Sequence, residues 1–526
     1  MYDVVFKNVR IIDGTGSPWY YGEVAVKDGE IKEVSYKVKG EAKKVIDGKN
    51  MVLSPGFIDS HSHSDTCWFA DNRGESKIRQ GVTTEVTGQC GMSPAPVTEK
   101  RRGSAISLKT DEGMEIKWST FGEYLSLLEE KGVAINIVPL VGHGALRSSA
   151  MGYEDRLPTD EELEEMKTLL VEALESGAFG FSSGLIYPPS SFADTSELIE
   201  LAKAMSPYGG IYETHMRNEG TGLLEAVEEA ISIGREGNVP VQISHHKVSA
   251  VKGWGLVKQS LAMIEEARKQ GVDVTCDQYP YIASSTGLTA IIPSWAHNGG
   301  PRALLARLKD PDISGKLKEE VEEHQRPSDG WQRILITSVA TEKNKFAEGK
   351  RIPEIAEILG TTNVEAAFKL LIEEELEVGY ARFGMCEEDV RTVMAHPLVR
   401  IGSDSTSSAI DGPLSSGKPH PRTYGTFARV IGKYVREEKV LPLEKAVFKM
   451  TGMPAARLKL VDRGLIRPGM KADLTLFDPD TIIDRATFEE PAQYPLGVEY
   501  VMVNGVMVVE NREHTGNIAG KVIRRR

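Results

Sequence analysis

Two histidines one residue apart, His61 and His63, stand in the segment PGFIDSHSHSD and could hold a metal ion together. Residues at i and i+2 of an extended strand point to the same side, so both imidazoles can face one divalent ion. The pair directly follows the apolar residues Phe57 and Ile58 of a predicted strand. In a barrel of parallel strands, side chains at such strand ends form the rim where active sites are built. The motif therefore predicts a metal site at the end of the first barrel strand.

Four more candidate ligands follow apolar runs of strand type: Cys90, His215, His245 and Asp404. With the histidine pair they supply nitrogen, sulfur and oxygen donors, a combination that suits zinc. His246 alternates to the opposite face of its strand, so we expect only His245 to point inward. A carboxylate at the position of Asp404 can also take a proton from activated water and pass it to a leaving amine.

Structural roles are the alternative for each of these residues. Cys90 could be a small buried hydrophobic residue, although the neighbouring glycines and proline indicate a tight loop. Asp404 could shape a turn or cap a helix. Candidate ligands after five different predicted strands favour a metal centre over these separate explanations. The remaining cysteines, Cys67, Cys276 and Cys386, are predicted to be structural.

The elements that position these residues fall into two kinds. Residues 1–54 and 465–526 contain short β-branched strands separated by Asp-Gly and Asn-Gly turns, which predicts one small β-sandwich formed by both chain ends. Residues 55–464 alternate apolar strands with amphipathic helices, as in a (β/α)8 TIM-like barrel of the α/β class. RILITSV is among the predicted barrel strands, and Asp160 is predicted to cap a helix. Residues 288–350 fit the alternation poorly and are predicted to be an insertion over the site.

Composition narrows the possible partners and the compartment. The 526 residues carry a net charge of −13 without a long basic run, so nucleic acid and anionic membranes are not expected as partners. The terminal Arg524-Arg525-Arg526 is predicted to be a solvated end. No apolar run approaches the ~20 residues of a membrane span, and no signal peptide is apparent. The four cysteines form no C-x-x-C pair, which predicts a cytoplasmic protein; its oligomeric state is left open.

The chain resembles the amidohydrolase superfamily of metal-dependent hydrolases. The resemblance rests on PGFIDSHSHSD, the histidines and aspartate at strand ends, and the closing GLIRPGMKADLTLFDP. Within the superfamily, GVTTEVTGQCGMSPAPV, GFSSGLIYPPSSFADTSEL, ISHHK and KPHPRTYGTFARV resemble segments of the D-aminoacylases, or N-acyl-D-amino-acid deacylases. Hydantoinase-like relatives carry a carboxylated lysine after the fourth barrel strand. The comparable segment here, GAFGFSSGLIY, has no lysine, and a Cys90 thiolate would suit the bridging position instead.

This resemblance implies roles for individual residues. It implies one tightly bound Zn²⁺ at Cys90, His215 and His245. It also implies a second, weaker position among His61, His63 and Asp404, with Asp404 as general base and acid. The positions that resemble substrate-contacting residues are Tyr187, Lys247, Tyr279, Ser285 and Arg422. A bidentate guanidinium such as that of Arg422 suits the carboxylate of an acylated amino acid.

The implied reaction is zinc-dependent hydrolysis of N-acyl-D-amino acids to a carboxylate and a free D-amino acid. The implied partner is therefore a small-molecule N-acyl amino acid. Two alternatives stay open at this point: a cyclic-amide hydrolase of the dihydropyrimidinase or hydantoinase kind, and a catalytically inactive structural relative. The missing lysine counts against the first alternative, and the full set of candidate ligands counts against the second.

Overall fold

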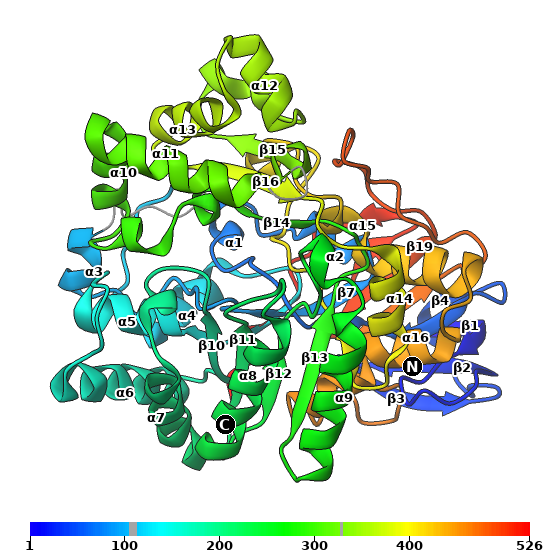
Figure 1. Cartoon of the computed structure of the whole chain (residues 1–526). Helices are drawn as coiled ribbons and strands as arrows, with labels where there is room; N and C mark the ends of the chain where they lie inside the picture. Colours follow the sequence, from blue (N-terminus) through cyan, green and yellow to red (C-terminus); the bar gives the residue numbers. More distant parts are fainter. Residues whose placement is uncertain (105–112, 327–329, 526) are drawn as a thin grey trace.

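Strands from both ends of the chain form one nine-stranded sheet. The computed structural model describes residues 1–104, 113–326 and 330–525. The two halves of the sheet join where β5 pairs antiparallel with β18, with Leu53 opposite Leu476. In Figure 1 the N-terminal strands β1, β2 and β4 lie at the right, beside β19. The strands of this sheet are β1 (Tyr2–Ile11), β2 (Tyr20–Lys27), β3 (Glu30–Ser35), β4 (Ala42–Asp47), β5 (Val52–Pro55), β18 (Leu474–Phe477), β19 (Val498–Val503), β20 (Val506–Glu510) and β21 (Glu513–His514).

The middle of the chain supplies parallel strands in two groups. One group has the order β17-β13-β12-β11-β10-β9, and the other has the order β6-β7-β8. Only Leu140 separates β8 from β9, and Asp404 N donates to His61 O (2.8 Å) just beyond β17 and β6. The first and last parallel strands are therefore neighbours. The strands are β6 (Phe57–Asp59), β7 (Val82–Thr87), β8 (Asn136–Pro139), β9 (Val141–Gly142), β10 (Gly180–Gly184), β11 (Ile211–His215), β12 (Val241–Ile243), β13 (Val274–Gln278) and β17 (Val399–Ile401).

Amphipathic helices connect these strands. In α6 the buried residues Met166 and Leu170 lie one helical turn apart, as burial of a single face requires. The helix begins one residue earlier than predicted: Thr159, not Asp160, is the cap. The Thr159 hydroxyl accepts from the Glu162 amide, and the Glu162 carboxylate accepts from the Thr159 amide, which satisfies two free donors. The main connecting helices are α4 (Phe121–Lys131), α5 (His143–Met151), α6 (Asp160–Glu175), α7 (Thr195–Met205), α8 (Leu223–Gly237), α9 (Leu256–Lys269), α14 (Glu387–Ala395), α15 (Arg422–Arg429) and α16 (Leu443–Met450).

A separate unit is inserted after β13. Its antiparallel sheet has the order β14-β16-β15, and its own hydrophobic cluster runs from Leu288 to Tyr380. Figure 1 shows the unit at the top, remote from β1 and β2. The prediction that RILITSV is a barrel strand was wrong, because β15 pairs antiparallel with β16 instead. The elements are β14 (Ser284–Gly287), α10 (Pro301–Lys309), α11 (Pro311–Gln325), β15 (Ile334–Val339), α12 (Ile352–Leu359), α13 (Asn363–Glu373) and β16 (Val378–Arg382).

The C-terminal segment is docked, contrary to the prediction of a solvated end. Ile523 N donates to Ile137 O (2.8 Å), which aligns the segment with β8. Arg524 donates to both carboxylate oxygens of Glu129 (2.8 Å each), and Arg525 donates to a backbone carbonyl. Arg526 lies outside the described residues. Local composition missed this contact because the partners lie some 400 residues earlier in the chain.

Within the described ranges, no helix is both long enough and apolar enough to cross a bilayer.

Candidate metal centre

The six residues predicted as metal ligands lie together at the carboxyl ends of the parallel strands. The Cys90 sulfur is central: it lies 3.4 Å from His61 Nε2, 3.4 Å from His245 Nε2 and 3.7 Å from His215 Nδ1. Asp404 Oδ1 lies 3.5 Å from His61 Nε2 and 3.1 Å from His63 Nε2. One ligand atom from each of the following residues falls within 4.8 Å of all the others: His61, Cys90, His245 and Asp404.

The centre opens toward His63. The side chain of His63 is 27% exposed, whereas that of His61 is fully buried and Asp404 is 10% exposed. Cys90 and His245 are also buried. A small molecule can therefore approach from the side of His63 and Asp404.

Three of these residues sit in left-handed backbone conformation, with φ of 53° at Cys90, 36° at His245 and 50° at Asp404. Such conformations are unfavourable for residues other than glycine, and they recur at functional sites. Gly88, just before Cys90, also has a positive φ, and a Cβ there would lie 1.9 Å from Leu140 O. The glycine lets the loop approach β8 closely and turn the thiol into the centre.

The surrounding charges favour ionised ligands. Burial alone would raise the pKa of the Cys90 thiol, but the charges of His61 and His245 hold that pKa well below its ordinary value. Burial likewise opposes ionisation of Asp404, yet the Arg422 guanidinium and His245 keep the carboxyl pKa well below its usual range. Thiolate and carboxylate are the forms that bind metal ions.

Two carboxylates that the sequence reasoning missed orient the histidines. Glu219 Oε1 lies 2.9 Å from His245 Nδ1, and Glu219 Oε2 lies 3.5 Å from His215 Nε2. Asp277 Oδ1 lies 3.6 Å from His61 Nδ1 and accepts from the His245 amide (2.7 Å). A carboxylate behind a histidine fixes its tautomer and directs the other ring nitrogen to the metal. The only sequence signal for Glu219 is its place four residues after His215.

The residues fit a zinc ion. Zinc bonds of about 2.3 Å to sulfur and about 2.0–2.1 Å to nitrogen place tetrahedral ligand atoms about 3.5 Å apart. The two distances of 3.4 Å from Cys90 Sγ to histidine nitrogens match this spacing. His215, Glu219 and His245 form a second cluster that shares His245 with the first. The donor set beside Cys90 therefore suits a zinc ion.

The five predicted substrate residues surround the centre in different ways. Arg422 Nη1 donates to Asp404 Oδ2 (2.7 Å), and Arg422 Nη2 donates to Ser285 O (3.2 Å). The Tyr279 ring lies beneath this guanidinium, with 4.7 Å between its centroid and Arg422 Cζ. The Tyr187 ring packs against His215 at 5.0 Å between centroids. Ser285 thus contributes its backbone carbonyl and Tyr279 its aromatic face.

Lys247 is buried, and its ammonium already contacts Glu219 and His245. Its Nζ lies 2.7 Å from Glu219 Oε1 and 2.8 Å from His245 Nδ1. The Glu219 carboxylate, whose pKa is lowered by His215 and Lys247 against the effect of burial, neutralises the ammonium. This geometry makes Lys247 a support for His245 as well as a candidate contact for substrate.

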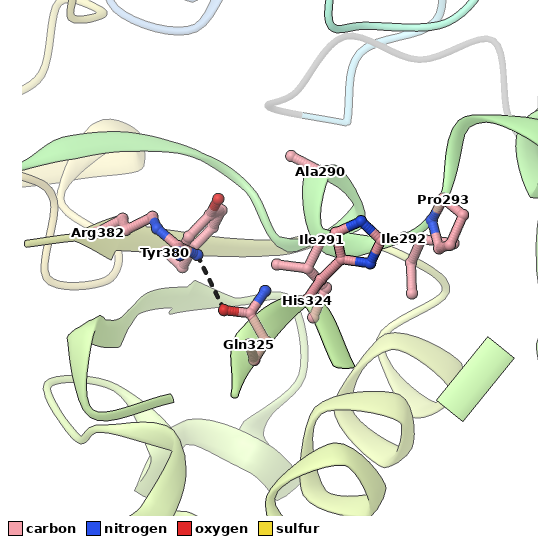
Figure 2. A pocket seen from close by; sticks show the side chains of 8 residues that line it. All are labelled: Ala290, Ile291, Ile292, Pro293, His324, Gln325, Tyr380 and Arg382. Carbon is pink, nitrogen blue, oxygen red and sulfur yellow. Dashed lines mark hydrogen bonds between the residues drawn. The ribbon is translucent and has the colours of Figure 1, made fainter. Parts of the chain in front are cut away.

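The inserted unit contains a hollow of about 320 Å³ (Figure 2). Ile291, Tyr380 and Arg382 line it, and Arg382 Nη1 donates to Gln325 Oε1 (3.1 Å). None of the six predicted metal ligands borders this hollow.

Comparison with known proteins places this centre in a family. The model of the amidohydrolase family matches residues 44–509. The chain belongs to the amidohydrolase family. It is 37% identical to the D-aminoacylase of Alcaligenes xylosoxydans xylosoxydans, covering 100% of this chain and 98% of that protein. It is 36% identical to an N-acyl-D-aspartate deacylase of the same organism, covering 99% and 95%.

A solved structure is similar throughout. The N-acyl-D-glutamate deacylase from Bordetella bronchiseptica, complexed with zinc and a phosphonate mimic of the tetrahedral intermediate, is 33% identical. The match covers 99% of each chain with a TM-score of 0.85. The described chain thus has the α/β fold of these amidohydrolases.

Proposed function

We propose that this chain is a zinc-dependent deacylase that hydrolyses the amide bond of N-acyl-D-amino acids, releasing a carboxylate and a free D-amino acid. The observation that carries the proposal is Cys90, whose sulfur lies within 3.7 Å of a nitrogen of three histidines. A cysteine in this place, with no lysine at the end of β10, matches the D-aminoacylase segments rather than those of hydantoinases. The full-length similarity to three deacylases of N-acyl-D-amino acids supports the same reaction.

The protein residues would share the work as follows. Cys90, His215 and His245 would hold the tight zinc, and His61, His63 and Asp404 would flank a weaker position. A bound zinc supplies Lewis acidity, which polarises the scissile carbonyl and lowers the pKa of water. Asp404, kept ionised by Arg422, would accept a proton from the attacking water. It would then return that proton to the departing amine nitrogen, which leaves as a neutral amine.

The two cations expected to orient the substrate, Arg422 and Lys247, each form an ion pair with a carboxylate of the protein. Arg422 pairs with Asp404 and Lys247 pairs with Glu219. The free donors of Arg422 would bind the substrate carboxylate in a bidentate manner. An acidic substrate side chain would then find no unpaired cation among these two predicted contacts. We therefore expect neutral D-amino acids to be preferred over D-aspartate and D-glutamate derivatives.

The architecture proposed for this function is a closed (β/α)8 barrel over residues 55–464. The parallel order from β6 to β17 and the hydrogen bonds between the residues after them support closure. Both chain ends, residues 1–54 and 465–526, would form the small β-sandwich. The inserted unit would extend past residue 350 to the end of β16, because β14 and β15 pair with that strand. The four cysteines form no disulfide in the described structure, which supports a cytoplasmic setting.

The test is release of free amine from paired N-acetyl-D- and N-acetyl-L-amino acids, with zinc supplied. Methionine, leucine, phenylalanine, aspartate and glutamate derivatives form the panel, and dihydrouracil and hydantoin are cyclic controls. We expect release from the D forms only, with neutral side chains fastest. Ring opening of the cyclic compounds without release from linear ones would replace the proposal with a cyclic-amide hydrolase. A zinc-loaded protein inert to the whole panel would indicate an inactive relative.

A further inference from the structure

Lys77 is a fully buried lysine behind the metal centre. It lies in the short helix α2 (Glu75–Ile78), and its side chain has no exposed surface. Burial of an ammonium is costly unless acceptors satisfy its protons. Lys77 is neither a predicted metal ligand nor a predicted substrate contact, so its burial must have another reason.

The ammonium has three protons and four acceptors, of which Ser405 Oγ is the most distant at 3.2 Å. Its Nζ lies 2.8 Å from Asp59 Oδ2, 2.6 Å from Ser403 Oγ and 2.9 Å from Ser405 O. Ser403 Oγ in turn donates to Asp59 Oδ2 (2.6 Å). Lys77 is thus the centre of a closed polar network, which we call the Lys77 network, consisting of Lys77, Asp59, Ser403 and Ser405.

The Lys77 network joins the two segments that carry the ligands of the weaker position. Asp59 Oδ1 accepts from the His61 amide (3.2 Å) and from the Ser403 amide (2.8 Å). Ser403 and Ser405 flank Asp404. One carboxylate and one ammonium therefore fix the end of β6 against the end of β17.

A buried network of this kind is stable when all its members are paired, because an unpaired ion in the interior is unfavourable. In its complete state it holds His61 and Asp404 at the 3.5 Å separation seen between Nε2 and Oδ1. Partners behind first ligands usually govern metal affinity, because they fix ligand orientation before the ion arrives.

We propose that Lys77 is a positioning residue of the metal centre, which holds His61 and Asp404 at the spacing that a shared metal ion requires. The inference rests on the proposed zinc-dependent function. Lys77 touches neither the metal ligands' side chains nor the substrate contacts; it acts through Asp59 and through the backbone on both sides of Asp404.

The chain offers a matched control in Lys449 of α16, which contacts the other end of β17. Lys449 is also buried, and its Nζ donates to Val399 O (2.9 Å) and to His396 O at the opposite end of β17. Lys77→Met and Lys449→Met remove the same charged group from the two ends of one strand. Zinc affinity in this test is that of the weaker position, measured as the second binding step in competition with a chromophoric chelator, and thermal unfolding of the metal-free proteins is measured alongside.

We expect Lys77→Met to weaken zinc binding about 10- to 100-fold, the range for loss of a partner that orients ligands. Lys449→Met should lower the unfolding temperature and leave zinc affinity within twofold of the wild type. Equal zinc affinity in wild type and Lys77→Met, or an equal loss in both variants, would overturn the inference alone. A wild-type protein that binds no zinc would overturn the proposed function as well.

If Lys77→Met does not fold, Ser403→Ala tests the same network more gently. It removes the hydroxyl between Lys77 and Asp59, and a net contribution of about 0.5–1.5 kcal/mol per hydrogen bond corresponds to roughly 2- to 10-fold weaker zinc binding. Unchanged affinity in Ser403→Ala would contradict the proposal in the same way.

Discussion

The two ends of the parallel strands use buried aspartates for opposite purposes. At the carboxyl ends, Asp404 has a strained backbone with φ of 50° and faces histidine nitrogens at 3.1 and 3.5 Å. At the amino ends, Asp473 accepts from Asn136 Nδ2 (3.1 Å), from the Asn504 amide (2.6 Å) and from Arg463. The first is held in an unfavourable conformation for chemistry, whereas the second is fully engaged with neighbours. One end of the strands therefore serves reactivity and the other serves stability.

The sharpest test of this contrast is Asp404→Asn. We expect kcat for the best N-acyl-D-amino acid to fall about 10²- to 10⁴-fold, because an amide cannot accept the proton that Asp404 would carry. The substitution also leaves the buried Arg422 without this ion-pair partner, so turnover is measured well below the unfolding transition. Steady-state kinetics, with zinc per chain measured on the same samples, check the prediction. Near-normal turnover in a variant that retains zinc would remove Asp404 from the mechanism.

The reverse pattern is expected for Asp473→Ala. Loss of this buried carboxylate leaves Arg463 with only the more exposed Asp462 as ion-pair partner, so we expect the free energy of unfolding to fall by about 3–5 kcal/mol. Urea unfolding measures that loss, and kcat measured below the unfolding transition should match the wild type. A large drop in kcat of the folded variant would show that the amino ends of the parallel strands contribute to catalysis as well as to stability.

Substitution of the two buried glutamates Glu219 and Glu197 should affect zinc affinity differently, by a smaller factor than the effect of Asp404→Asn on kcat. Glu219→Gln weakens the support behind His215 and His245, and we expect zinc affinity to fall about 10- to 100-fold. Glu197→Gln is the matched control, because Glu197 pairs with His143 (2.7 Å) and Arg147 (3.1 Å), outside the metal cluster. Chelator competition on both variants should show a loss for Glu219→Gln only. Equal affinities would mean that Glu219 does not orient the ligands.

The smallest expected effect lies at the docked C-terminus. Arg524→Ala removes a partly exposed ion pair with Glu129, and such pairs contribute about 0.2–1 kcal/mol. Urea unfolding at low and high salt should show a loss that shrinks as salt rises, with kcat unchanged. A loss that is independent of salt would indicate that packing of the arginine stem, not charge, secures the segment.

Residue type and position after apolar runs were sufficient to predict which side chains gather at the centre. His61, Cys90 and Asp404 could be found because strand ends of a parallel sheet meet at one rim. Glu219 and Lys77 could not. One follows its strand in an irregular loop and the other lies on a one-turn helix, where neither periodicity nor propensity indicates burial.

The limits of the fold prediction have a similar cause. RILITSV has the composition of any buried strand, and only its pairing with β16, more than forty residues later, assigns it to the inserted sheet. The docking of Arg524 against Glu129 likewise depends on contacts between residues far apart in the chain. Patterns local in sequence predict elements well and their distant partners poorly.

The contact between His63 and Asp404 also limits when the metal centre can form during synthesis of the chain. The two residues are separated by 341 positions. At about 5–20 residues per second, a ribosome needs roughly 17 to 70 seconds to make that stretch. His61 and His63 are therefore synthesised long before Asp404. The delay between Lys77 and its partners Ser403 and Ser405 is similar, because they are 326 and 328 positions apart. The centre therefore cannot be complete until Asp404 has been made, late in the 526-residue sequence.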